Sequence, residues 1–109
     1  MAYDESTALR LRDALGTRSD IVEKKMFGGL VFLLSGNMCC GIVGDTLMVR
    51  VGADGYEEAL GQPHAREMDF TGRALKGFVY VEPEGFDSVD DLHSWLERGV
   101  RFAKSLPPK

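Results

Sequence analysis

The sequence has only two cysteines, and they are neighbours, Cys39 and Cys40. Adjacent cysteines can close only a strained ring, which excludes a stabilising framework of disulfide bonds. The sequence also has no C-x-x-C pair and only two histidines, so the usual spacing of zinc ligands is missing and we expect no metal. This cysteine usage is typical of a reducing compartment, and we therefore expect a cytoplasmic protein.

An excess of positive charge is also missing. The 109 residues include 13 Lys and Arg against 17 Asp and Glu, which gives a net charge of −4. Because tight nonspecific binding to nucleic acid usually needs a basic domain, we expect no direct nucleic-acid binding. Neither glycine-rich phosphate-binding motif is present. No arrangement of nucleophile, base and acid can be placed either, so we expect neither an enzyme nor a cofactor.

Charged side chains are missing altogether from Met26 to Gly44. A membrane-spanning helix needs about 20 apolar residues, and a polar turn in its middle is costly. Here "SGN" at 35–37 divides the stretch, and "GD" at 44–45 follows it. Both are signals of two-residue hairpin turns, so the stretch predicts strands and no membrane span. The first residues are acidic and lack an apolar run, so no signal peptide is expected.

The capping residues, turn residues and apolar patterns of the sequence predict the elements of one domain over 1–109. A first helix is capped by Asp4 or Ser6, is apolar at Ala8, Leu11 and Leu15, with Leu9 broadening that face, and stops at Gly16. A second helix over 54–60 is capped by Asp54. A third helix is capped by Ser88 and carries an apolar stripe that begins at Val89. This helix ends before Pro107. The predicted strands are 30–34, 38–43, 46–51, 66–70 and 78–82, with a loop over 71–77.

The predicted order is α-β-β-β-α-β-β-α. It is typical of an α+β domain with two layers, a mostly antiparallel five-stranded sheet and helices packed on it. The first predicted strand is apolar on both sides of its pleat, with Leu30, Phe32 and Leu34 on one side and Val31 and Leu33 on the other. If helices cover one face, the other needs a cover, so we expect a homodimer.

The adjacent cysteines have two interpretations. Neighbouring strand residues point to opposite faces, so Cys39 and Cys40 would share a pocket only if a bulge intervened. Unpaired cysteine is commonly a buried, small hydrophobic residue, which favours a structural role for both. The alternative is a thiol or small-ligand sensor, which would need a nearby cation to activate a thiol.

Five basic residues raise a further alternative: Lys24, Lys25, Arg50, Arg73 and Lys76. They could form a basic patch for an accessory DNA-contacting protein. A solvated sheet edge, where lysines prevent aggregation, agrees better with the acidic net charge.

The stretches "KKMFGGLVFLLSGNMCCGIVGDTLMVRVG" and "MDFTGRALKGFVYV" together resemble the N-terminal domain of the TfoX/Sxy family of bacterial competence regulators. The resemblance implies a two-layer α+β fold and a cytoplasmic bacterial protein. Members that regulate competence act as coactivators beside a CRP-type activator. The motif positions are Met26, Phe27, Gly28, Gly29, Gly72, Arg73, Lys76 and Gly77, for which we expect structural roles rather than binding roles.

The sequence and the resemblance together predict a non-enzymatic module for regulation or protein interaction. Its expected partner is another protein, such as a transcription factor, and a second copy is also expected as a partner. The sensor using Cys39 and Cys40 and the accessory DNA-contacting protein remain as alternatives.

Overall fold

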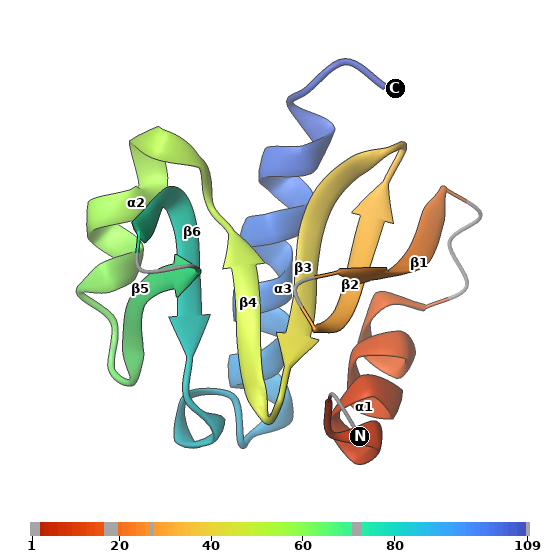
Figure 1. Ribbon diagram of the computed structural model, residues 1–109, viewed down its shortest axis with the longest axis horizontal. Coiled ribbons are helices and arrows are strands. Elements are labelled where there is room, and N and C mark those ends of the chain that lie inside the picture. The colour runs from red at the N-terminus through yellow and green to blue at the C-terminus, as the bar shows by residue number, and fades with distance from the viewer. Residues whose placement is uncertain (1–2, 17–19, 27, 71–72, 109) are drawn as a thin grey trace.

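The computed structural model describes residues 3–16, 20–26, 28–70 and 73–108 (Figure 1). In chain order, its elements are α1 (Glu5–Leu15), β1 (Ile21–Met26), β2 (Gly29–Leu34), β3 (Asn37–Val43), β4 (Thr46–Arg50), α2 (Gly52–Leu60), β5 (Ala65–Phe70), β6 (Arg73–Val81), the short 3-10 turn η1 (Pro83–Gly85) and α3 (Val89–Lys104). Within this part of the chain no helix is long and apolar enough to cross a membrane.

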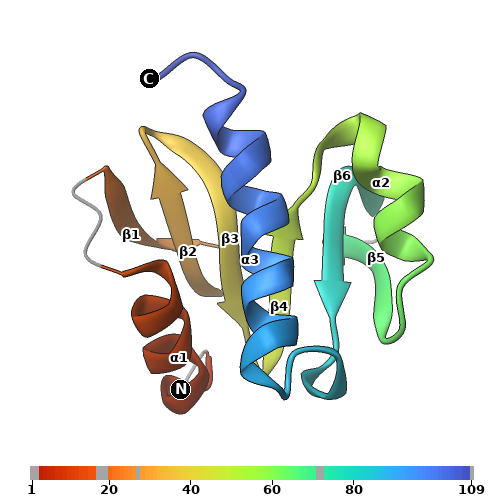
Figure 2. The same cartoon turned by 180° about the vertical axis from the view of Figure 1, so that it is seen from behind.

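The six strands form one sheet in the order β1-β2-β3-β4-β6-β5, and every neighbouring pair is antiparallel. Helices α1 and α3 lie across the face of the sheet seen in Figure 2. Buried side chains of all three helices join one core on this face. The α+β class and the two layers are therefore confirmed, and we call the covered face the helix side of the sheet.

The expected number of five strands was wrong, because β1 was missed. Its middle residues, from Val22 to Lys25, are all exposed, so the strand shows no alternation of apolar and polar side chains. This is the composition of an edge strand, where charged lysines discourage pairing with another chain. The Arg12 guanidinium of α1 forms an ion pair with Glu23, at 2.7 Å, and ties this strand to the helix layer.

The two predicted hairpin turns are confirmed. Ser35 and Gly36 both have positive φ angles, of 51° and 86°, and join β2 to β3. Gly44 has φ of 61° and begins the turn between β3 and β4. Its carbonyl oxygen accepts a 2.7 Å hydrogen bond from the Asp4 amide, which attaches the start of α1 to this hairpin.

Helix boundaries follow the predicted caps at two of three helices. The Asp4 carboxylate accepts a hydrogen bond from the Thr7 amide at the start of α1, and Gly16 ends it with φ of 75°. The Ser88 hydroxyl accepts one from the Asp91 amide at the start of α3. The start of α2 was predicted wrongly: the helix begins at Gly52, without a side-chain cap, so Asp54 lies in its first turn.

The expected apolar faces of the helices need two corrections. Leu9 is 61% exposed and Val89 is 66% exposed, so neither joins the core. Conversely, one residue that was not predicted to be buried does belong to the core. Gly99 is buried in the middle of α3, where the missing side chain lets the helix approach the Cys39 carbonyl on β3.

The predicted loop over 71–77 was also wrong from Arg73 onward, because β6 begins there. The strand is irregular there: Glu67 pairs with Val79, but Asp69 pairs with Ala74. Gly77 lies within this irregular stretch with φ of 95°. A residue with positive φ inside a strand interrupts the pleat, which is why the sequence reads locally as a turn.

Candidate functional site

The side of the sheet opposite the helices carries a second apolar cluster of its own. We call it the methionine face, and it consists of Met26, Val31, Leu33, Met38, Val43, Met48, Met68, Phe78 and Tyr80. The chain has five methionines, and every one except Met1, which lies outside the described residues, belongs to this cluster. Val31, Met48 and Met68 are fully buried, whereas Met26 and Met38 are partly exposed.

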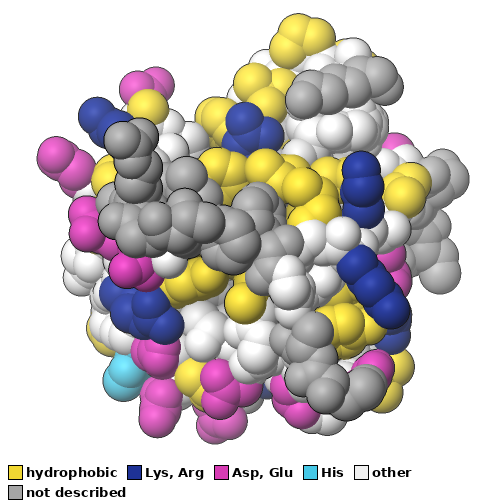
Figure 3. Space-filling model, in the orientation of Figure 1, with side chains coloured by type: hydrophobic (Ala, Val, Ile, Leu, Met, Phe, Trp, Pro, Cys, Tyr) yellow, Lys and Arg dark blue, Asp and Glu magenta, His cyan; other side chains and the backbone are white. Residues whose placement is uncertain are grey.

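The register of the sheet shows why these side chains meet. One cross-strand row on this face runs from β1 to β5 through Lys24, Val31, Gly41, Met48, Tyr80 and Arg66. Side chains two residues away along each strand join it, because alternate residues share a face. The row is therefore apolar in its middle and cationic at both ends. In Figure 3, hydrophobic side chains gather over the middle of this face, and Lys and Arg side chains stand beside them.

Two glycines allow β2 and β3 to approach each other closely on the methionine face. A Cβ on Gly41 would lie 2.5 Å from the Leu30 carbonyl oxygen, and one on Gly29 would overlap the Ile42 carbonyl oxygen. Glycine is therefore required at both positions, because any side chain would collide with the backbone of the neighbouring strand. Val31, which pairs with Gly41, is fully buried within the single chain.

Arginines cover the aromatic rings at the margin of this face. The Arg50 guanidinium lies 5.5 Å from the centre of the Phe78 ring and 5.1 Å from that of Phe102 on α3. The Arg66 guanidinium lies 4.8 Å from the centre of the Tyr80 ring. Such cation–π contacts hold the arginines flat against the rings. Burial raises the pKa of the Tyr80 hydroxyl, so this side chain stays neutral.

The cysteine pair does not lie as predicted. Phe32 pairs with Cys40 but Leu33 pairs with Met38, so β3 has a bulge and Cys39 is its extra residue. Because of this bulge both cysteines are fully buried in the core on the helix side, and the expectation of opposite faces was wrong. A hydrogen bond with the Cys39 thiol, together with burial, raises the pKa of Cys40 well above its ordinary value. A protonated, buried thiol is poorly nucleophilic, which favours the structural role.

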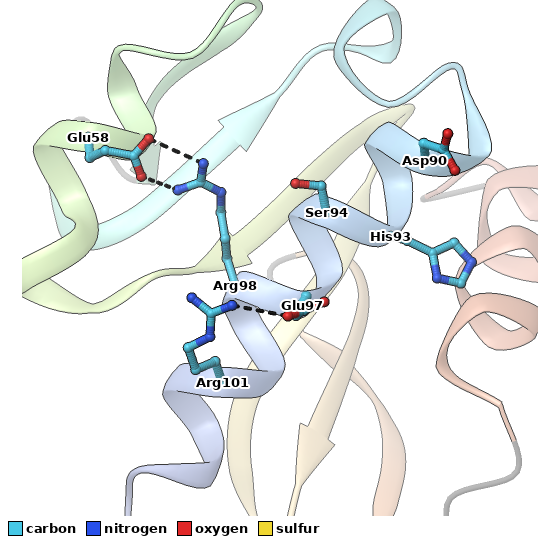
Figure 4. Close-up of a pocket in the computed structure, with 7 residues that line it drawn as sticks. All are labelled: Glu58, Asp90, His93, Ser94, Glu97, Arg98 and Arg101. Atoms are coloured by element: carbon cyan, nitrogen blue, oxygen red, sulfur yellow. Dashed lines mark hydrogen bonds and ion pairs between the residues drawn. The ribbon is translucent and has the colours of Figure 1, made fainter.

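A groove between α2 and α3 is a further candidate site (Figure 4). Glu58 on α2 and Arg98 on α3 face each other across it, with Nη1 to Oε1 at 2.5 Å and Nη2 to Oε2 at 3.3 Å. The hydrogen bonds from Arg98 lower the pKa of Glu58. Arg98 also lies over the Trp95 ring, with its guanidinium 4.9 Å from the ring centre. Its charge is thus already paired.

One part of this groove has a volume of about 450 Å³ and a lining of mostly charged residues. Figure 4 shows Ser94 and His93 pointing to different sides of α3, so they do not form a nucleophile and base pair. The neighbouring part, of about 310 Å³, has Val51 and Phe102 in its lining with Arg98 and Arg101. The groove could hold a ligand by its volume, but the described residues do not form a catalytic or metal-binding arrangement in it.

The motif positions serve turns and close approaches where the structure describes them. Gly28 has φ of 72°, which only glycine adopts freely, and it lies in the turn between Met26 and Gly29, which pair at the end of the β1–β2 hairpin. Gly77 accepts a hydrogen bond from the Val51 amide, at 2.7 Å, on its carbonyl oxygen. Lys76 is exposed. Phe27, Gly72 and the Arg73 side chain lie outside the described part of the chain.

The basic residues considered for a patch are not gathered on one surface where the structure describes their side chains. Lys24 and Lys25 follow each other along β1, so they point to opposite sides of the sheet. Arg50 is occupied by the Phe78 and Phe102 rings. The two histidines are exposed, and within the described ranges no three residues of metal-binding type come together.

The methionine face was missed by the sequence analysis, although a signal for it exists. Met26, Met48 and Met68 stand at positions of the opposite parity to the core residues of their strands, whereas Met38 has the same parity as Cys40 and Ile42 and reaches this face only because of the bulge in β3. Reading that parity needs the correct register, and the β3 bulge and the irregular β6 change the register between strands.

Comparison with known proteins shows the family of this chain. A search among curated proteins found no match. A scan against family models matched residues 13–103 to the model described as the TfoX N-terminal domain. That range contains both stretches in which the motif positions lie, and all six strands. The chain therefore belongs to the TfoX N-terminal domain family.

Proposed function

We propose that this protein is a non-enzymatic regulatory module of the bacterial cytoplasm, and that it acts by binding another protein through the methionine face. Membership of the TfoX N-terminal domain family supports a regulatory role. One observation carries the site: apolar side chains of β1, β2 and β3, among them Met26 and Met38, stay partly exposed on the side of the sheet away from the three helices. Methionine-rich surfaces adapt their shape to a partner, since the side chain is unbranched and polarisable.

A protein partner fits this face better than a single-stranded nucleic acid. Proteins that bind single strands stack bases on open aromatic rings. Here the rings of Phe78 and Tyr80 are occupied by the guanidinium groups of Arg50 and Arg66. The net charge of −4 points the same way. The buried thiols give the sensor alternative no support, since neither is accessible.

Capture from a bacterial lysate tests this proposal with three variants of the tagged protein. Val22 and Leu9 are matched in exposure, at 59% and 61%, but Val22 pairs with Leu33 on the methionine face and Leu9 lies on α1. We expect the wild type and Leu9→Glu to retain the same bound protein, and Val22→Glu to lose it. Met38→Glu should lose it as well, because a charge would enter the apolar surface.

Two outcomes would overturn the proposal. One is equal capture by Val22→Glu and Leu9→Glu, which would place the binding surface elsewhere. The other is a shift of labelled DNA at low salt that Val22→Glu abolishes, because phosphate contacts strengthen as salt falls and such a result would assign the face to nucleic acid. Circular dichroism of each variant checks that all of them are folded.

A further inference from the structure

We infer that Met26 and Met38 are sites of reversible oxidation by hydrogen peroxide, and that their sulfoxides prevent the methionine face from binding its partner. This inference rests on the proposed function and adds a chemical regulation of the same surface. It depends on which sulfur atoms of the chain an oxidant can reach and on where those atoms lie.

The sulfur atoms of the described residues fall into two groups by their burial. Met26 and Met38 are partly exposed. The other four side chains are 0% exposed: Cys39, Cys40, Met48 and Met68. Peroxide attacks the thiolate form of cysteine, and a thiol buried among apolar side chains stays protonated and out of reach. In the part of the chain that the structure describes, the accessible sulfur atoms are therefore those of two methionines.

The two accessible methionines lie at opposite ends of the exposed apolar surface. Met38 belongs to a cross-strand row with Leu33 and the exposed Val22. Met26 lies at the other end of β1, where it pairs with Gly29. Because Gly29 has no side chain, its position on β2 contributes nothing that could cover the Met26 thioether. A partner that covers the surface between these two ends would bury both thioethers.

The oxidation is a transfer of one oxygen atom. The thioether sulfur attacks one oxygen of hydrogen peroxide, the O–O bond breaks, and an S–O bond forms. Sulfur gives up two electrons, and the second oxygen leaves with both protons as water. Methionine sulfoxide reductases reverse the step: two thiols supply two electrons and two protons, become a disulfide, and the sulfoxide oxygen leaves as water.

The oxidation changes the surface in a way that opposes binding. A sulfoxide is polar, whereas the thioether that it replaces is apolar. Burying the sulfoxide against a partner without a hydrogen-bond donor costs free energy, so binding becomes weaker. Met48 and Met68 remain reduced because they are fully buried, so the sheet stays folded while its surface changes.

The first test measures the order of oxidation in the folded, full-length chain. Hydrogen peroxide is added stepwise, and peptide mass spectrometry follows the gain of one oxygen atom at each methionine. We expect Met26 and Met38 to be oxidised about tenfold faster than Met48 and Met68, since the rate follows exposure, and this difference to vanish in urea. Circular dichroism checks that the oxidised protein is folded.

The second test repeats the capture from a lysate with the oxidised protein. We expect capture to fall about tenfold, because a polar group would be buried without a partner, and methionine sulfoxide reductase with dithiothreitol to restore it. Two double variants locate the effect, each compared with its own untreated sample. Peroxide should not change capture by Met26→Leu/Met38→Leu, but it should lower capture by Met48→Leu/Met68→Leu as in the wild type. Met1 is common to all of them and cannot explain a difference.

Three results would contradict the inference. The first is oxidation of Met48 or Met68 as fast as that of Met26 and Met38 in the folded protein. The second is unchanged capture once both accessible methionines are oxidised. The third is a loss of capture that the reductase does not restore. An untreated wild type that captures no partner would overturn the proposed function and the regulation with it, whereas the order of oxidation is decided by mass spectrometry alone.

Discussion

Gly99 shows how one residue sets the distance between the two layers. It lies in the middle of α3, and a Cβ there would overlap the Cys39 carbonyl oxygen and lie 3.3 Å from the Cys39 sulfur. The residues at which helices begin or end, such as Asp4, Gly16 and Ser88, could be predicted from the sequence, because their effect on the backbone is local. It missed Gly99, because a close approach between a helix and a bulged strand is not encoded near either residue.

We predict opposite effects of alanine at two helical glycines. Gly99→Ala should lower the free energy of unfolding by about 1–3 kcal/mol, because the new methyl group must displace backbone in a packed core. Gly55→Ala should raise it by up to about 1 kcal/mol, since its Cβ would meet only the Val51 side chain, at 3.9 Å, and alanine favours a helix. Urea unfolding of both variants measures this, and a loss of stability in Gly55→Ala would contradict it.

The cysteine pair predicts a dependence of stability on alkaline pH. The pKa of Cys40 is raised in the folded protein, above an ordinary value of 9.0. Above about pH 9 the unfolded chain therefore loses a proton that the folded protein keeps, and the free energy of unfolding falls by up to about 1.4 kcal/mol per pH unit. Tyr56 and Tyr80 act in the same direction from a higher pH, since their pKa values are also raised.

Cys40→Ala should reduce this slope between about pH 8.5 and pH 10, whatever its own cost in stability. Urea unfolding at several pH values gives the slope for the wild type and the variant. An unchanged slope in Cys40→Ala would show that the thiol titrates alike in the folded and unfolded states, against its burial with Cys39.

At the scale of elements, the predictions that the structure confirms are those of turns and helix caps. The hairpins at Ser35 and Gly44 follow from two-residue loops whose backbone needs positive φ. Strand β1 was missed because it is an edge strand, exposed on both sides at its centre. The bulge at Cys39 was missed because every residue of "MCCGIV" is apolar or glycine. Such a sequence has no alternation of polar and apolar residues that a bulge would interrupt.

The β2–β3 turn offers a prediction with two substitutions at one position. Ser35 and Gly36 both have positive φ, which defines the hairpin turn that prefers Asn-Gly. Ser35→Asn should therefore raise the free energy of unfolding by a few tenths of a kcal/mol, and Ser35→Val should lower it by about 1–2 kcal/mol, because a β-branched side chain is strained there. Thermal unfolding compares the two variants, and a gain of stability in Ser35→Val would contradict the assigned turn.

At the scale of the whole molecule, the sheet has two unlike sides. One side is covered by three helices, and its core could be predicted from apolar periodicity together with the order of the elements. The other holds the methionine face, which depends on register across six strands and therefore could not be read from any single segment. The uncharged stretch from Met26 to Gly44 supplies both sides, and this explains its lack of charge.

The central claim is that a partner protein binds the methionine face, and site-specific photo-crosslinking inside bacterial cells tests it most directly. A photoreactive amino acid replaces Val22 in one variant and Leu9 in the other, two positions of nearly equal exposure on opposite sides of the sheet. We predict that position 22 forms a covalent adduct with one other protein and that position 9 does not. An adduct from position 9 alone, equal adducts from both positions, or no adduct from position 22 would contradict the account.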